Sequence, residues 1–80
     1  MKYLTKDYVE GEILETISLM QLNKETVPTL QTIQIEDLAE RFLFDWNEVG
    51  DYEADLGRTL LEFLREEFIY NRINYTFKDE

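Results

Sequence analysis

The densest group of chemically active side chains lies between residues 36 and 55. Eight carboxylates in this segment face one cation, Arg41, so its net charge is −7. Carboxylates at this density can bind a metal ion, transfer protons or form an acidic surface for a basic partner. The eight residues are Glu36, Asp37, Glu40, Asp45, Glu48, Asp51, Glu53 and Asp55.

Metal binding is the first of these chemistries to consider. Asp51, Glu53, Asp55 and Glu62 have the spacing of the carboxylates at the first, third, fifth and twelfth positions of an EF-hand calcium loop. That loop needs a glycine at its sixth position, where this chain has Leu56. We therefore predict no metal site, and we expect these acids to stabilise the N-terminus of a helix.

Catalysis is restricted by two missing residue types, because the chain contains no histidine and no cysteine. Thiolate nucleophiles, histidine bases and the usual zinc ligand sets are therefore excluded. A pair of carboxylates could still support acid–base chemistry, but the acids are spread along the chain and no pair stands apart. We predict that the protein is not an enzyme and uses no cofactor.

The acidic segment then has two interpretations, a solvated face that keeps the protein soluble or a surface for a basic partner. Like charges four residues apart destabilise a helix by a few tenths of a kcal/mol, about 0.2–0.5, which favours a binding role. Phe44 and Trp46 lie within the segment and point in different directions on a helix. An aromatic anchor inside a charged rim is typical of a protein-binding hot spot. We include Trp46 in the predicted surface, with Phe44 as the alternative anchor.

The whole chain has 80 residues, a net charge of −10 and 44% hydrophobic residues, which indicates one small folded domain. It has no apolar run of the length of a signal peptide or a membrane span, so we expect a cytoplasmic protein. The eight Lys and Arg residues are scattered, which argues against direct binding to nucleic acid or to a membrane.

A first helix is predicted from about residue 7 to residue 22. Asp7 and Glu10 resemble a capping box at its start, and Asn23 suits its end. Its predicted apolar stripe consists of Val9, Ile13, Ile17 and Met20, widened by Tyr8, Leu14 and Leu22.

A second helix is predicted over residues 36–49 and a third over residues 51–70, with Asp51 as the cap of the third. Residues 30–35 alternate and predict a short extended segment, although a helix starting at Pro28 remains an alternative. Residues 73–77 also alternate, which predicts a strand paired with residues 2–4 or 30–35, or a frayed helical extension.

The fold class that follows is a mainly α single domain of three helices with a short β element.

On the third helix Glu62 is spaced to pair with both Arg58 and Arg65. Arg58, Arg65 and Arg72 recur every seven residues and could also face the acidic second helix of another copy, so a homodimer is a further prediction.

The segments 7–10 and 12–14 resemble, over fewer than ten residues, the opening helix of small acidic bacteriocin immunity proteins. The later tyrosine-bearing motif of that family has no counterpart in this chain, so the resemblance assigns no family. It implies a protein that covers the active site of a basic toxin.

Charge and size together predict a non-catalytic inhibitor that binds the basic nucleic-acid-binding surface of a partner protein. Phage inhibitors of restriction enzymes and of CRISPR nucleases act as nucleic-acid mimics in this way. An immunity protein or antitoxin, and a regulatory subunit that binds through the apolar face of the third helix, are the alternatives.

Overall fold

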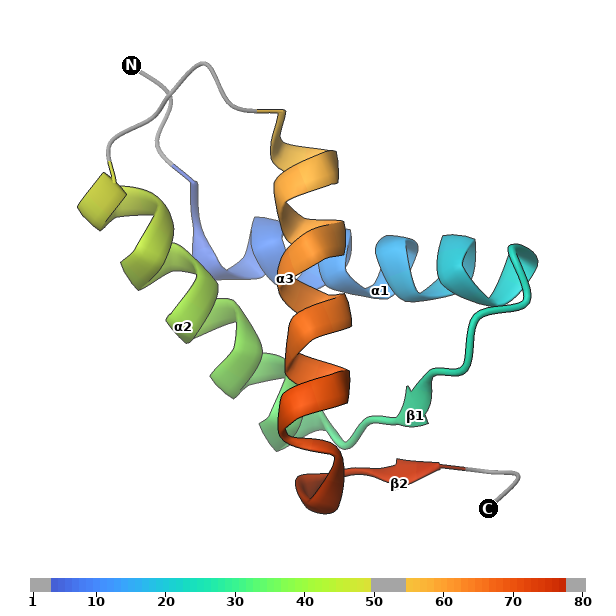
Figure 1. The fold of residues 1–80 in the computed structure, drawn as a ribbon. Helices are drawn as coiled ribbons and strands as arrows, with labels where there is room; N and C mark the ends of the chain where they lie inside the picture. The colour runs from blue at the N-terminus through green and yellow to red at the C-terminus, as the bar shows by residue number, and fades with distance from the viewer. Residues whose placement is uncertain (1–3, 50–54, 78–80) are drawn as a thin grey trace.

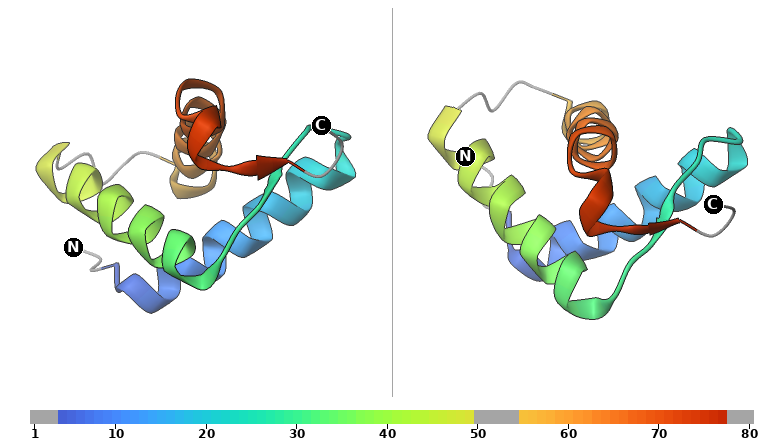
Figure 2. Two further views of the ribbon diagram at one scale, coloured as in Figure 1. Left: turned by 90° about the horizontal axis from the view of Figure 1, so that it is seen from below. Right: turned by 60° about the horizontal axis from the view of Figure 1, so that its bottom comes forward.

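Three helices in two layers and a short β pair form the described part of the chain, residues 4–49 and 55–77 of a computed structural model. The elements are α1 (Lys6–Leu22), β1 (Pro28–Thr29), α2 (Thr32–Val49), α3 (Leu56–Tyr70), the 3₁₀ helix η1 (Arg72–Asn74) and β2 (Thr76–Phe77) (Figure 1). α1 and α2 form the two arms of a V, and α3 lies across its open side (Figure 2). The predicted fold class is confirmed.

The core lies between the two layers, where each helix contributes its apolar stripe. The buried apolar residues are Val9, Ile13, Met20, Leu38, Ala39, Phe42, Leu60, Leu64, Phe68 and Phe77. The apolar face of α3 is therefore largely used inside the fold. The predicted stripe of α1 is too wide, because Tyr8, Leu14 and Leu22 are exposed on the outside of the helix.

The ends of α1 are fixed by residues other than those predicted. Thr5 is the N-cap, because its backbone is extended and its hydroxyl accepts a hydrogen bond of 3.1 Å from the N–H of Tyr8. Asp7 lies inside the first turn instead. At the other end Lys24, not Asn23, takes the left-handed conformation, with a φ of 63°. Two backbone bonds then close a Schellman motif, from Lys24 to Gln21 at 2.9 Å and from Glu25 to Met20 at 2.9 Å.

α2 begins at Thr32, four residues before the predicted Glu36, so the extended segment at residues 30–35 was wrong. The Gln34 side chain accepts a hydrogen bond of 2.9 Å from the N–H of Gln31, which is the reciprocal half of a capping box. This hydrogen bond stabilises the first turn of α2, and the turn therefore accommodates the β-branched residues 32, 33 and 35, which have a lower helix propensity. A helix start at Pro28 was also wrong, because Pro28 lies in β1.

α3 begins at Leu56 and is capped by Asp55, whose carboxylate accepts from the N–H of Arg58 at 3.3 Å. The predicted cap Asp51 lies outside the described residues.

The C-terminal strand is confirmed but is shorter than predicted. β2 pairs antiparallel with β1, with Pro28 opposite Phe77, and not with the two segments that the sequence suggested. Within the described residues no helix is both long and apolar enough to cross a membrane.

Candidate partner-binding surface on α2

The acidic residues of α2 lie on the side of the helix that faces away from the core. Leu38, Ala39 and Phe42 point inward and are buried. Four predicted acids are exposed and Glu36 is half-buried. The exposed ones are Asp37, Glu40, Asp45 and Glu48. The structure therefore brings five of the eight predicted acids onto the outward half of one helix.

Two apolar side chains lie among these acids. Ile33 is 65% exposed and Phe44 is 69% exposed. Phe44 follows Glu40 by four residues and precedes Glu48 by four, so its ring lies between two carboxylates on the helix surface. We define the outer face of α2 as Ile33, Glu36, Asp37, Glu40, Phe44, Asp45 and Glu48.

Trp46 does not belong to this surface, and its assignment to the predicted site is corrected. It is partly buried against the core, and its ring centroid is 5.7 Å from that of Phe42. The ring of Phe63 on α3 also contacts Phe42, nearly edge-on, with the ring centroids 5.4 Å apart. The helical phase explains the difference, because Trp46 follows Phe42 by one turn whereas Phe44 lies nearly opposite. Phe44 is the exposed aromatic anchor.

Two cations partly neutralise the outer face. Lys6 of α1 donates to Glu40 at 2.9 Å, and Arg41 donates to Asp37 at 3.1 Å. The hydrogen bond from Lys6 to Glu40 raises the pKa of Lys6, so this amine stays charged. Both pairs are exposed, and such pairs contribute little to stability. The ion pairs that the described residues form on this face thus involve Asp37 and Glu40, at the N-terminal half of α2.

Of the other three acids of the predicted site, the structure describes only Asp55. Asp55 caps α3 and so serves a structural purpose. Asp51 and Glu53 lie outside the described residues. Within residues 4–49 and 55–77, no group of three or more acidic side chains is placed to hold a metal ion.

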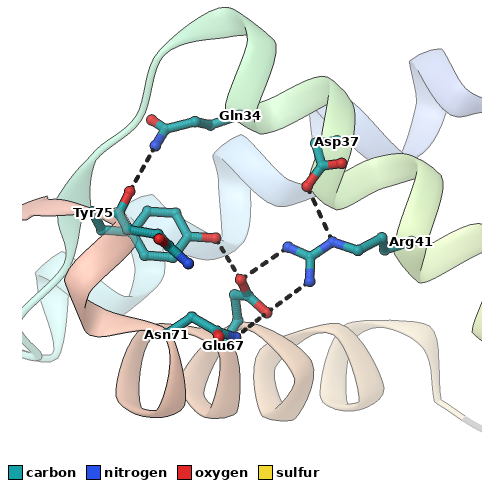
Figure 3. Close-up of polar contacts among 7 residues, drawn as sticks. Gln34, Asp37, Arg41, Glu67, Asn71 and Tyr75 are labelled. Carbon is teal, nitrogen blue, oxygen red and sulfur yellow. Dashed lines mark hydrogen bonds and ion pairs between the residues drawn. The ribbon is translucent and has the colours of Figure 1, made fainter.

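A second polar cluster, which the sequence did not predict, surrounds Glu67 of α3 (Figure 3). Glu67 is 8% exposed, and the Arg41 guanidinium approaches it with two parallel hydrogen bonds of 3.1 and 2.9 Å. The Tyr75 hydroxyl donates to the same carboxylate at 2.7 Å, and the Asn71 amide donates at 3.1 Å. Nearby, the Gln34 amide donates to the Asn74 carbonyl at 3.1 Å. Side chains from α2, α3 and the segment before β2 therefore meet at one buried carboxylate.

The electrostatics of this cluster favour a charged Glu67. Burial raises the pKa of Glu67, but the hydrogen bonds from Arg41 and Tyr75 outweigh burial and lower it below its usual value. Burial and the bond to Glu67 raise the pKa of Tyr75, so the phenol stays protonated and remains a donor. Since Glu67 already accepts four hydrogen bonds, its chemical role is to join α2 to α3 and to the C-terminal segment.

The position of Glu67 carries a signal that could have been recognised. Glu67 follows Leu60 by seven residues and Leu64 by three, so it occupies the apolar stripe of α3. A carboxylate at such a position requires buried donors. Their identity could not be predicted, because Arg41 and Tyr75 come from distant parts of the chain.

An open cleft of about 630 Å³ lies between α2 and the C-terminal end of α3. Its walls combine the N-terminal part of the outer face with the Glu67 cluster. The lining residues are Ile33, Gln34, Glu36, Asp37, Glu40, Arg41, Glu67, Asn71, Asn74 and Tyr75. The outer face of α2 is thus a ridge that borders a concave, mainly acidic surface.

The ion pairs of α3 differ in part from those predicted. Arg58 and Glu62 approach to 3.6 Å, as expected. Arg65 instead donates to Glu25, the last residue of the Schellman motif, at 2.7 and 2.9 Å. The pairing is bidentate and side-on, because Nε and Nη2 of the guanidinium each donate to one oxygen of the Glu25 carboxylate.

Comparison of the chain with protein-family models, with curated proteins and with solved structures gives no significant match. Function is therefore inferred from the surface alone.

Proposed function

We propose that the protein is a non-catalytic binding protein whose outer face of α2 occupies a basic, nucleic-acid-binding surface of a partner protein. The observation that carries this proposal is the exposed Phe44 surrounded by carboxylates on a helix that buries its other side. An exposed aromatic residue can fill a pocket, and surrounding charges guide association with a partner of opposite charge.

The charge density of α2 supports a comparison with one strand of nucleic acid. From Glu36 to Glu48 the helix carries five acids and Arg41, a net charge of −4. At a rise of 1.5 Å per residue this segment is about 18 Å long, which gives roughly one charge per 4.5 Å. One strand of DNA carries one charge per roughly 3.4 Å of axis and a duplex one per roughly 1.7 Å. In charge per unit length, α2 therefore resembles one strand of nucleic acid more closely than a duplex.

The proposal implies an inhibitor, because a groove that holds α2 cannot hold a nucleic-acid strand at the same time. An inhibitor of the phage type, directed at a nuclease in the cytoplasm, is one form of this function. The partner is defined by its chemistry, a groove that combines Lys and Arg residues with an apolar pocket for Phe44.

The test is capture of partners from a lysate of the cells that express the protein. The immobilised protein is washed with steps of rising salt and, separately, with single-stranded or duplex nucleic acid. We expect a nucleic-acid-binding protein to be released between about 0.15 and 0.5 M salt, where surface charges are increasingly screened. We also expect release by single-stranded nucleic acid.

Two charge-matched variants identify the surface. Asp45→Lys with Glu48→Lys changes the outer face of α2 and should abolish capture. Glu62→Lys with Glu66→Lys makes the same change in net charge on α3 and should retain it. Equal capture by both variants, or a partner that is insensitive to salt and to nucleic acid, would refute the proposed function.

A further inference from the structure

A second surface, independent of the proposed function, lies on the outside of α1. Five residues of α1 follow one another at alternating spacings of four and three residues, the spacing of a seam between two packed helices. Four of them are exposed and Glu12 is half-buried. We define the outer seam of α1 as Tyr8, Glu12, Glu15, Leu19 and Leu22.

The seam is apolar at its ends and acidic in the middle. Leu19 is 57% exposed and Leu22 is 77% exposed at one end, and Tyr8 is half exposed at the other. Single exposed apolar residues are common, but large apolar residues repeated along a helix at packing distance mark an interaction site. The inward side of α1 already packs on α2 and α3, so this helix has apolar residues on two of its faces.

The acidic middle of the seam places two carboxylates close together. Glu12 and Glu15 are three residues apart, and a side-chain hydrogen bond to Glu15, burial and the charge of Glu15 raise the pKa of Glu12. A cation placed between them would stabilise both carboxylates in the charged form.

A glycine, Gly11, lies beside the seam inside α1. A glycine inside a helix is less favourable than alanine. A Cβ atom at Gly11 would meet no atom within 4 Å, so the packing of the described residues gives no reason for a glycine. A helix that packs closely on the seam would give one, because glycine permits close approach.

The charges disfavour two other occupants of the seam. A parallel second copy of α1 would place Glu12 and Glu15 opposite the same residues, and an antiparallel copy aligned end to end would place the two Glu15 residues opposite each other. An anionic membrane would be repelled by the same carboxylates.

From this arrangement we infer that the outer seam of α1 binds an amphipathic helix of a partner protein, with apolar residues at its ends and Lys or Arg at its centre. Apolar contacts with Tyr8, Leu19 and Leu22 supply affinity, and the central cations select the partner and its register.

The test uses a synthetic peptide of 17 residues, the length of α1, with leucine at the outer seam positions and lysine at the two central ones. A second peptide has glutamate in place of lysine. Binding is measured by fluorescence anisotropy of the labelled peptide and mapped by NMR. We expect the lysine peptide to shift signals of α1 and to bind at least about tenfold more tightly than the glutamate peptide.

Matched variants locate the site. Leu19→Gln with Leu22→Gln should weaken binding of the lysine peptide by about tenfold or more, because two apolar contacts are lost. Glu12→Gln with Glu15→Gln should weaken binding and reduce its salt dependence. Ile33→Gln with Phe44→Gln, a similar change on the outer face of α2, should leave peptide binding unchanged, so this test is separate from that of the proposed function. Circular dichroism verifies that each variant is folded.

Three results would overturn the inference. One is equal affinity for the two peptides, and another is undiminished binding by the Leu19→Gln, Leu22→Gln variant. The third is self-association of the wild-type protein in sedimentation that this variant abolishes, because the seam would then be occupied by a second copy.

Discussion

The inner and outer sides of α2 contain the same kinds of residue with opposite surroundings. On the inner side Phe42 contacts Trp46 and Phe63, and at the edge of that side Arg41 reaches the buried Glu67 of α3. On the outer side Phe44 is exposed, and Asp45 and Glu48 extend into solvent. An aromatic ring or a carboxylate therefore stabilises the fold or remains available to a partner according to its contacts, and residue type alone does not decide between these roles.

The two phenylalanines provide the largest predicted contrast. Phe42→Ala should lower the free energy of unfolding by about 3 kcal/mol or more, because it leaves a cavity between Trp46 and Phe63. Phe44→Ala should change it by less than about 0.5 kcal/mol, since the ring is mostly exposed. Urea denaturation followed by circular dichroism measures both values. Similar losses for the two variants would contradict the assignment of inner and outer sides.

The buried carboxylate should give the next largest effect. Glu67→Ala leaves the donors of Arg41, Tyr75 and Asn71 without their acceptor, and the free energy of unfolding should fall by about 2 kcal/mol. The effect stays below that of a fully buried ion pair because Arg41 is 43% exposed and can be hydrated. Glu67→Gln, which keeps one acceptor oxygen, should lose about half as much. Glu66→Ala, one residue away and exposed, is the control and should change little.

The pH dependence of stability tests the charged state of Glu67. The pKa of Glu67 is lower in the folded protein than its usual value of 4.5, so its contribution to stability is present above pH 4.5. This contribution is lost as the pH falls through the lower, folded-state pKa. In acid titrations of unfolding free energy, Glu67→Gln should show a smaller decrease than the wild-type protein. The same decrease in both proteins would contradict a lowered pKa of Glu67.

Tyr75 should have the opposite dependence. Its pKa is raised above the usual value of 10.0, so its contribution is complete below pH 10 and is lost as the pH rises through the folded-state pKa. Tyr75→Phe should therefore flatten the decrease in stability at alkaline pH. An unchanged alkaline curve would show that the bond to Glu67 does not form in solution.

The sequence predicted the three helices, the end of α3 at Tyr70 and most of the core, because these depend on helical periodicity. The predicted starts of α1 and α2 were wrong, because each start depends on a hydrogen bond between a side chain and the nearby backbone. These bonds are Tyr8 N–H to Thr5 at α1 and Gln31 N–H to Gln34 at α2. The sequence also missed the Glu67 cluster, since Arg41 and Glu67 are 26 residues apart and no local pattern reports their contact. The acidic outer face was predicted, but the choice between Phe44 and Trp46 required the helical phase relative to the core.

The most direct test of the binding role of the outer face is the salt dependence of affinity for the captured partner. The dissociation constant is measured at several salt concentrations for the wild-type protein and for Asp45→Asn with Glu48→Gln, which is nearly isosteric. We predict that the variant retains its unfolding free energy, binds more weakly at low salt and loses affinity less steeply as salt is added. The same salt dependence for both proteins would show that the outer carboxylates of α2 do not contact the partner.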